Sequence, residues 1–209
     1  LIPLSKWIIL LAMRINGITE VETTDEGQLV HLDQRMLQTP SLAVEGGMLE
    51  TIRLGHIARE NLELALSTLE DRDPEKISDV RQRETVVDRV CDGVSQYLIK
   101  LCMLQINDKE NETVTSLLNT ISDMERVGDH AENIAELAEE MSNEGIIFSV
   151  SAMEELKEMI NSTLSSYDNA VKALELDDIS YAKNTVVLED EVDALEKKLR
   201  AGHIDRLSN

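Results

Sequence analysis

The sequence predicts an all-α fold, an antiparallel bundle of long helices, and three observations carry this prediction. The chain has 209 residues, of which 42% are apolar but only 2% are aromatic, and it has only three prolines. Sandwiches and barrels depend on aromatic and β-branched runs with frequent turns, so this composition argues against an all-β fold. Long segments also carry apolar residues at helical spacing, and several of them begin with residues that typically start helices.

Helix-start signals divide the chain into five helices. Thr39–Pro40 provides a cap followed by proline at the first helical position, and Asp73–Pro74 repeats this signal. Gly46–Gly47 is expected to delay or bend the first helix, and a capping box at Ser151–Glu154 is expected to open the fourth. The helices are expected over about residues 39–70, 73–104 and 112–141, from residue 151, and over about residues 180–207.

The second, third and fourth predicted helices each present one apolar face, which we expect to form the core. These faces contain Val80, Val87, Cys91, Val94, Leu98 and Leu101; Val114, Leu117, Ile121, Met124, Ala131, Ala135 and Ala138; and Leu156, Met159, Ile160, Leu164, Tyr167, Val171 and Leu174.

An internal repeat with an offset of 105 residues organises the helices. The segment 84–88 (ETVVD) aligns with 189–193 (EDEVD). This predicts two three-helix repeats, over residues 39–145 and 146–209, of which the second lacks its third helix. That helix would start near residue 218, so we expect the sequence to be truncated before it.

The chain before residue 39 differs from the rest. Residues 16–38 are polar and contain glycine, which indicates a linker. Residues 1–15 contain a short apolar stretch between Lys6 and Arg14. A bilayer span needs about 20 apolar residues, so the stretch is either a core helix or the end of a membrane helix that begins upstream.

The charge balance limits the partners. Twenty Lys and Arg residues against 41 Asp and Glu residues give a net charge of −21, which excludes an unaided nucleic-acid or anionic-membrane partner because phosphates would be repelled. An acidic protein that binds an anion needs a cation between its own carboxylates and that anion. Cys91 and Cys102 lie eleven residues apart in one predicted helix, too far to form a disulfide, and are expected to be reduced core residues.

Pairs of acidic residues with the spacing E-x-x-x-D are the candidate metal ligands. Spacing of four places both carboxylates on one helix face, where they repel each other unless a cation lies between them. Oxygen ligands of this kind suit Mg²⁺, Mn²⁺, Ca²⁺ or iron. With 41 acidic residues, the same spacing also arises by chance on solvated faces. The pairs are Glu84 with Asp88, Glu125 with Asp129, and Glu189 with Asp193.

The segment 122–136 concentrates these features. It places Glu125, Asp129 and Asn133 at steps of four, with His130 adjacent as an auxiliary candidate alongside Asn133. Gly128 inside a helix costs about 1 kcal/mol relative to alanine, so we expect a close backbone approach there.

Motifs of several enzyme classes are absent from the sequence. No histidine follows a glutamate at a distance of three, which argues against a di-iron carboxylate bundle. There is also no nucleophile elbow, P-loop or dinucleotide-binding motif. The sequence therefore predicts no catalytic site and a protein that is not an enzyme.

The segment 124–134 (MERVGDHAENI) resembles the signature helix of PhoU-like domains, which are duplicated three-helix bundles that regulate phosphate uptake. The segment 31–44 (HLDQRMLQTPSLAV) resembles the junction between the membrane domain of bacterial sodium/phosphate cotransporters and their cytoplasmic PhoU-like domain. This second resemblance favours the end of a membrane helix for residues 1–15.

The resemblance implies a cytoplasmic regulatory domain at the bacterial membrane, with the membrane domain of the same transporter as its partner. Sodium and inorganic phosphate would be handled by that membrane domain. It implies a divalent or iron-type metal cluster held by the E-x-x-x-D residues, with the last pair of the family pattern missing. Faces uncovered by the missing helix would favour a homodimer. Two alternatives remain: a free-standing PhoU-like accessory protein, and a helical scaffold without metal.

Overall fold

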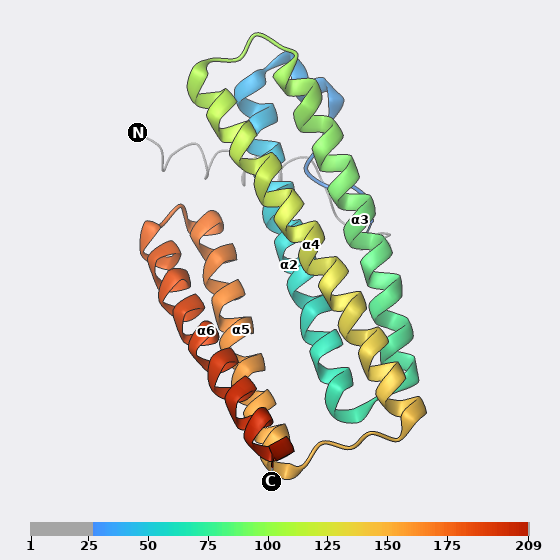
Figure 1. Ribbon diagram of the computed structural model, residues 1–209. Coiled ribbons are helices and arrows are strands. Elements are labelled where there is room, and N and C mark those ends of the chain that lie inside the picture. Colours follow the sequence, from blue (N-terminus) through green and yellow to red (C-terminus); the bar gives the residue numbers. More distant parts are fainter. Residues whose placement is uncertain (1–26, 209) are drawn as a thin grey trace.

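The computed structural model describes residues 27–208, and within that range all regular structure is helical (Figure 1). The all-α prediction is confirmed. The predicted membrane-helix end, residues 1–15, lies outside the described residues, as does the linker up to residue 26. No helix within residues 27–208 is long and apolar enough to cross a bilayer. The elements are η1 (Gln34–Gln38), α2 (Pro40–Asp71), α3 (Pro74–Cys102), α4 (Asp108–Glu144), α5 (Val150–Leu176) and α6 (Ile179–Ser208).

Helices α3, α4 and α5 begin at side chains that accept from free backbone N–H groups, whereas Thr39 lies at the predicted cap position of α2 but its side chain makes no cap hydrogen bond. The Asp73 side chain accepts a hydrogen bond from Glu75 N, as expected for a cap. Asn107 and Glu110 form a reciprocal capping box that starts α4 four residues before the predicted start. The fourth helix begins one residue earlier than expected, because Ser149 caps it by accepting from Ala152 N; the predicted capping box at Ser151 is wrong.

Helices α2, α3 and α4 form a three-helix bundle around the main core. The predicted apolar faces of α3 and α4 are buried along their whole length. Gly46 and Gly47 do not delay α2, which begins at Pro40. Each lies at a close approach instead: a Cβ at Gly47 would lie 2.6 Å from Leu98 Cδ2 on α3, and one at Gly46 would lie 2.8 Å from the carbonyl oxygen of His31.

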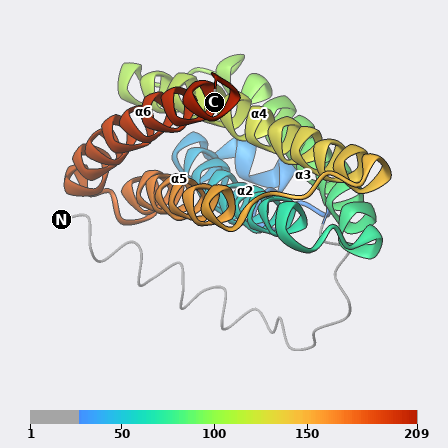
Figure 2. The same ribbon diagram turned by 60° about the horizontal axis from the view of Figure 1, so that its bottom comes forward.

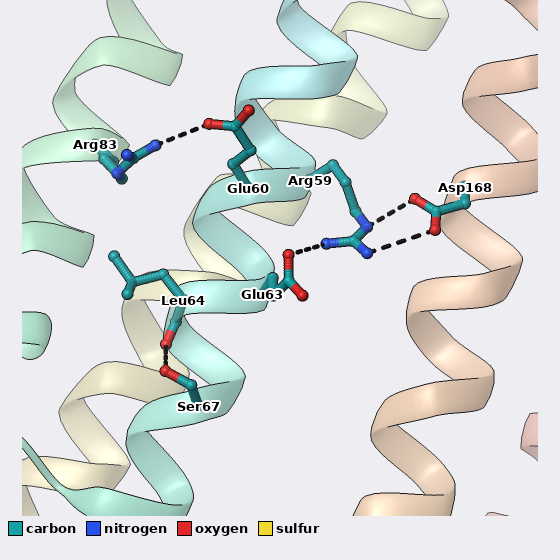
Figure 3. A network of polar contacts seen from close by, with 7 residues as sticks. All are labelled: Arg59, Glu60, Glu63, Leu64, Ser67, Arg83 and Asp168. Atoms are coloured by element: carbon teal, nitrogen blue, oxygen red, sulfur yellow. Dashed lines mark hydrogen bonds and ion pairs between the residues drawn. The ribbon is translucent and has the colours of Figure 1, made fainter.

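Helices α5 and α6 form a hairpin that joins the bundle through the contact of α5 with α2 (Figure 2). The Arg59 guanidinium of α2 binds Asp168 of α5, with Nε 2.7 Å from Oδ1, and also pairs with Glu63 (Figure 3). The Tyr167 hydroxyl donates to the Gly55 carbonyl over 3.1 Å. Within the predicted apolar face of α5, only Val171 is fully buried, because this hairpin lacks a third helix packed against it among the described residues.

The described part of the predicted linker, residues 27–38, lies against the bundle. Leu32, Met36 and Leu37 are partly buried and pack on the core of α2, α3 and α4. Cys91 is buried and Cys102 is exposed, and both are free thiols. The core prediction therefore holds for Cys91 and is wrong for Cys102, which ends α3 on its solvent side.

Candidate functional site

Carboxylates of α3 and α4 lie along the seam, by which we mean the line of contact between these two helices. The Glu84 side chain is hydrogen-bonded to Asp88, one turn further along α3. Burial raises the pKa of Glu84 to about 7, and this hydrogen bond and the negative charges of Asp88, Glu132 and Asp129 raise it further in the same direction. Two carboxylates held this close to each other offer oxygen ligands of the kind that a hard cation prefers.

Glu125 belongs to the same seam, one turn before Asp129. Burial raises the pKa of the Cys91 thiol to about 12, and the charges of Glu125, Asp88 and Asp92 add to this effect. Two of the three predicted pairs, Glu84 with Asp88 and Glu125 with Asp129, are therefore brought together from two helices. We call these four residues the α3–α4 carboxylates.

Gly128 allows α4 to approach α3 at the level of these carboxylates. A Cβ at Gly128 would lie 3.0 Å from Val87 Cγ1, and Gly128 itself is buried. The close approach predicted for this glycine is confirmed, and Val87 is the side chain that approaches it.

The α3–α4 carboxylates fit a hard cation by their chemistry, but their side chains are not arranged around one point. Within residues 27–208 no group of three or more His, Cys, Asp or Glu side chains is arranged as a metal site. All four side chains offer oxygen atoms, which Mg²⁺, Mn²⁺ and Ca²⁺ prefer. The metal assignment stays a prediction.

A buried amide lies at the same level of the bundle. Both polar atoms of the Asn61 side chain are buried without a hydrogen-bond partner in the described structure. Its neighbour Glu60 pairs with Arg83 of α3, the residue before Glu84. Asn61 and Glu84 therefore lie at a similar height along the bundle. Unsatisfied buried amides are uncommon in folded proteins, and Asn61 places one inside the α2–α3–α4 bundle.

The third predicted pair lies elsewhere. Glu189 and Asp193 are exposed on α6 and line an open groove of about 760 Å³ between the hairpin and the bundle. His130 of α4 lines the same groove, opposite these two acids. Asn133 is exposed, and its Nδ2 donates to the backbone carbonyl of Asp129 over 2.8 Å.

The internal repeat relates this groove to the α2–α3–α4 core. Every α5 and α6 residue that lines the groove corresponds, at the predicted offset of 105, to a residue of α2 or α3. Thr163, Ser166, Tyr167 and Ala170 correspond to Ala58, Asn61, Leu62 and Ala65, and Thr185, Glu189, Val192 and Asp193 correspond to Val80, Glu84, Val87 and Asp88. Under the predicted repeat, the groove would correspond to the side of α2 and α3 on which α4 packs.

Sequence reasoning missed Glu132 and Asn61. Glu132 lies seven residues after Glu125, on the same face of α4, and this spacing was a usable signal. Asn61 gave no such signal, because its burial results from the packing of three helices.

Comparison with known proteins shows which family this part of the chain resembles. The PhoU domain family matches residues 51–138, a range that includes all of α3 and the four α3–α4 carboxylates. The chain contains a PhoU-like domain. The range that the family model matches lies within the α2–α3–α4 bundle.

Three relatives illustrate the range of similar proteins. A phosphate-specific transport system accessory protein PhoU homolog of Thermotoga maritima is 28% identical over 153 residues, which cover 72% of this chain and 65% of that protein. YjbB of Escherichia coli, whose name describes inorganic phosphate export, is 21% identical over 85% of this chain but only 33% of its own length. A PhoU homolog of Rhizobium meliloti is 34% identical over 40% of this chain and 34% of that protein. No solved structure matches the chain.

Proposed function

We propose that this PhoU-like chain is the cytoplasmic regulatory domain of a sodium-dependent phosphate transporter and that it acts through a metal bound at the α3–α4 carboxylates. Sodium and phosphate would be carried by the membrane part of the same transporter. A bound metal would supply positive charge on an acidic surface, where it can attract phosphate or a partner. The observation that carries the proposal is that the Glu84–Asp88 and Glu125–Asp129 pairs lie on adjacent helices, α3 and α4, near enough for the charge of Asp129 to act on Glu84.

The YjbB relative supports placing the domain in a longer transport protein. That protein is named for phosphate export and is about three times as long as the part that this chain matches. The Thermotoga relative supports a second candidate, a free-standing accessory protein of a phosphate transport system, because it carries that name and the chain spans 65% of its length. In both candidates the domain regulates phosphate transport and catalyses no reaction.

The groove beside α6 belongs to the same proposal. The third helix expected for the second repeat would pack there as α4 packs on α2 and α3, and it would place its own side chains opposite Glu189 and Asp193. Where this helix is lacking, a homodimer that covers the groove is the alternative.

Elemental analysis of the purified chain, prepared without chelators, tests the metal part of the proposal. We expect bound metal in a fixed ratio to protein, and its loss in the double variant Glu125→Gln/Asp129→Asn. The control variant Glu136→Gln/Glu140→Gln removes the same charge from two exposed residues of the same helix and should keep the metal. A metal-free wild-type protein, or equal loss in both variants, would remove the metal site and leave a helical docking domain.

A further inference from the structure

The segment of residues 28–33, which we call the strap, is held on the bundle by a carboxylate that the sequence did not single out. Glu50 of α2 is fully buried, with 0% of its surface exposed. Its Oε2 accepts hydrogen bonds from two consecutive backbone N–H groups of the strap, Val30 at 3.1 Å and His31 at 2.7 Å. A side chain of α2 thus binds the main chain of a segment about twenty residues away in sequence.

Arg53 completes this contact from the other side. Its Nε donates to Glu50 Oε1 over 2.6 Å, and its Nη2 donates to the carbonyl of Gln28 over 2.8 Å. A buried carboxylate is strongly destabilising unless it is paired and hydrogen-bonded. Arg53 is on the same helix as Glu50, but the other two hydrogen bonds of Glu50 form only while the strap lies in place.

The bundle surface under the strap is shaped to receive it. A Cβ at Gly46 would lie 2.8 Å from the His31 carbonyl oxygen, and one at Gly93 would lie 2.7 Å from Leu29 Cδ1. The Tyr97 hydroxyl of α3 donates to the carbonyl of Asp33 over 3.2 Å. Two glycines therefore leave room for the strap, although each of them weakens the helix in whose interior it lies.

The strap combines polar contacts with limited apolar burial, because Leu32 is only partly buried on the core. Leu29 and Val30 remain 37% and 56% exposed. If the strap leaves, water reaches Glu50 and Arg53 and hydrates both charges, so α2 and α3 can stay folded. Local opening of this kind needs less free energy than global unfolding.

We propose that the strap and Glu50 form a latch that opens and closes as one unit on an intact bundle. When it is closed, it fixes the place on α2 and α3 at which the preceding chain joins the domain. When it is open, it uncouples that chain from the bundle. This inference goes beyond the proposed function and does not depend on metal binding.

Hydrogen–deuterium exchange of the full chain tests the latch. In Glu50→Gln the side chain loses its charge. If its amide oxygen stays on the strap, its NH2 group faces the Arg53 Nε donor, so the strap and Arg53 hydrogen bonds cannot both be kept. We expect exchange at Val30 and His31 to become about ten-fold faster or more, with the core of α2–α4 still protected. Glu60→Gln is the matched control, because Glu60 is an exposed glutamate of the same helix that also pairs with an arginine. It should leave the strap unchanged.

Gly46→Ala tests the same inference without changing a charge. Alanine favours a helix interior over glycine, so this variant should stabilise α2 if the strap has no role. The latch instead predicts that the new methyl group displaces His31 and opens the strap, with faster exchange at residues 30 and 31. Unchanged strap exchange in both variants would overturn the proposal. So would loss of protection in the strap and the bundle together, since the strap would then not open as its own unit.

Discussion

Glu84 combines partial burial with a hydrogen bond to a second acid, and this sets how the metal-free protein responds to pH. Its pKa is about 7 in the folded chain against a usual value of 4.5. Because the folded-state pKa is raised, the contribution to stability is fully present below about pH 4.5 and is lost as the pH rises through 7.

The variant Glu84→Gln removes this titration. We expect wild-type protein in chelator to lose roughly 1 kcal/mol of unfolding free energy relative to Glu84→Gln between pH 4.5 and 7.5, a value reduced for partial exposure. Urea unfolding at several pH values measures the difference. A wild-type protein that gains stability relative to the variant over this range would contradict the assignment.

Cys91 and Cys102 differ in burial, and their reactivity should differ with it. The pKa of Cys91 is raised to about 12, chiefly by burial, so its thiol stays protonated and inaccessible at pH 8. Cys102 is exposed at the end of α3. We expect iodoacetamide to modify Cys102 in the folded chain and both residues after unfolding, as measured by mass spectrometry. Modification of Cys91 at the same rate as Cys102 in the folded chain would show that α3 is packed differently.

At the scale of elements, the Arg59–Asp168 pair is a defined polar link between the bundle and the α5–α6 hairpin. Its two side chains are 19% and 41% exposed, so the pair contributes about 1 kcal/mol or less. Asp168→Asn should therefore weaken the hairpin contact modestly and increase hydrogen exchange in α5 more than in α3. Glu63→Gln, which removes the other partner of Arg59 within α2, is the control and should leave α5 unchanged.

Local sequence signals predicted the helices well, whereas features that depend on contacts between residues distant in sequence were not predicted. Caps at Thr39 and Asp73 placed two helix starts within one residue. The start of α4 was missed because the Asn107–Glu110 capping box precedes the apolar run that was used to find the helix. Gly46 and Gly47 were misinterpreted because their neighbours, His31 and Leu98, are distant in sequence.

The same limit applies to the candidate site. The spacing of four predicted that Glu84 lies on the same helix face as Asp88, and Glu125 on the same face as Asp129. Whether the two pairs lie near each other depends on how α3 packs on α4. The strap was assigned to a linker for the same reason: Glu50 had no local pattern to show that it binds residues 30 and 31.

At the scale of the whole molecule, the described residues 27–208 form a three-helix bundle joined to a two-helix hairpin (Figure 2). An open groove lies between the two parts. The PhoU match and the α3–α4 carboxylates both lie in the bundle. The bundle is therefore the part in which a metal should bind, and binding to the folded state alone should raise the stability of the whole chain.

Thermal unfolding of the chain with Mn²⁺ and with chelator tests this central claim most directly. At a Mn²⁺ concentration a hundred times the dissociation constant, the melting temperature should rise by about 5–10 °C. The rise should be absent in Glu125→Gln/Asp129→Asn and kept in Glu136→Gln/Glu140→Gln. A wild-type melting temperature that does not respond to Mn²⁺, or an equal response in the Glu125→Gln/Asp129→Asn variant, would contradict the account.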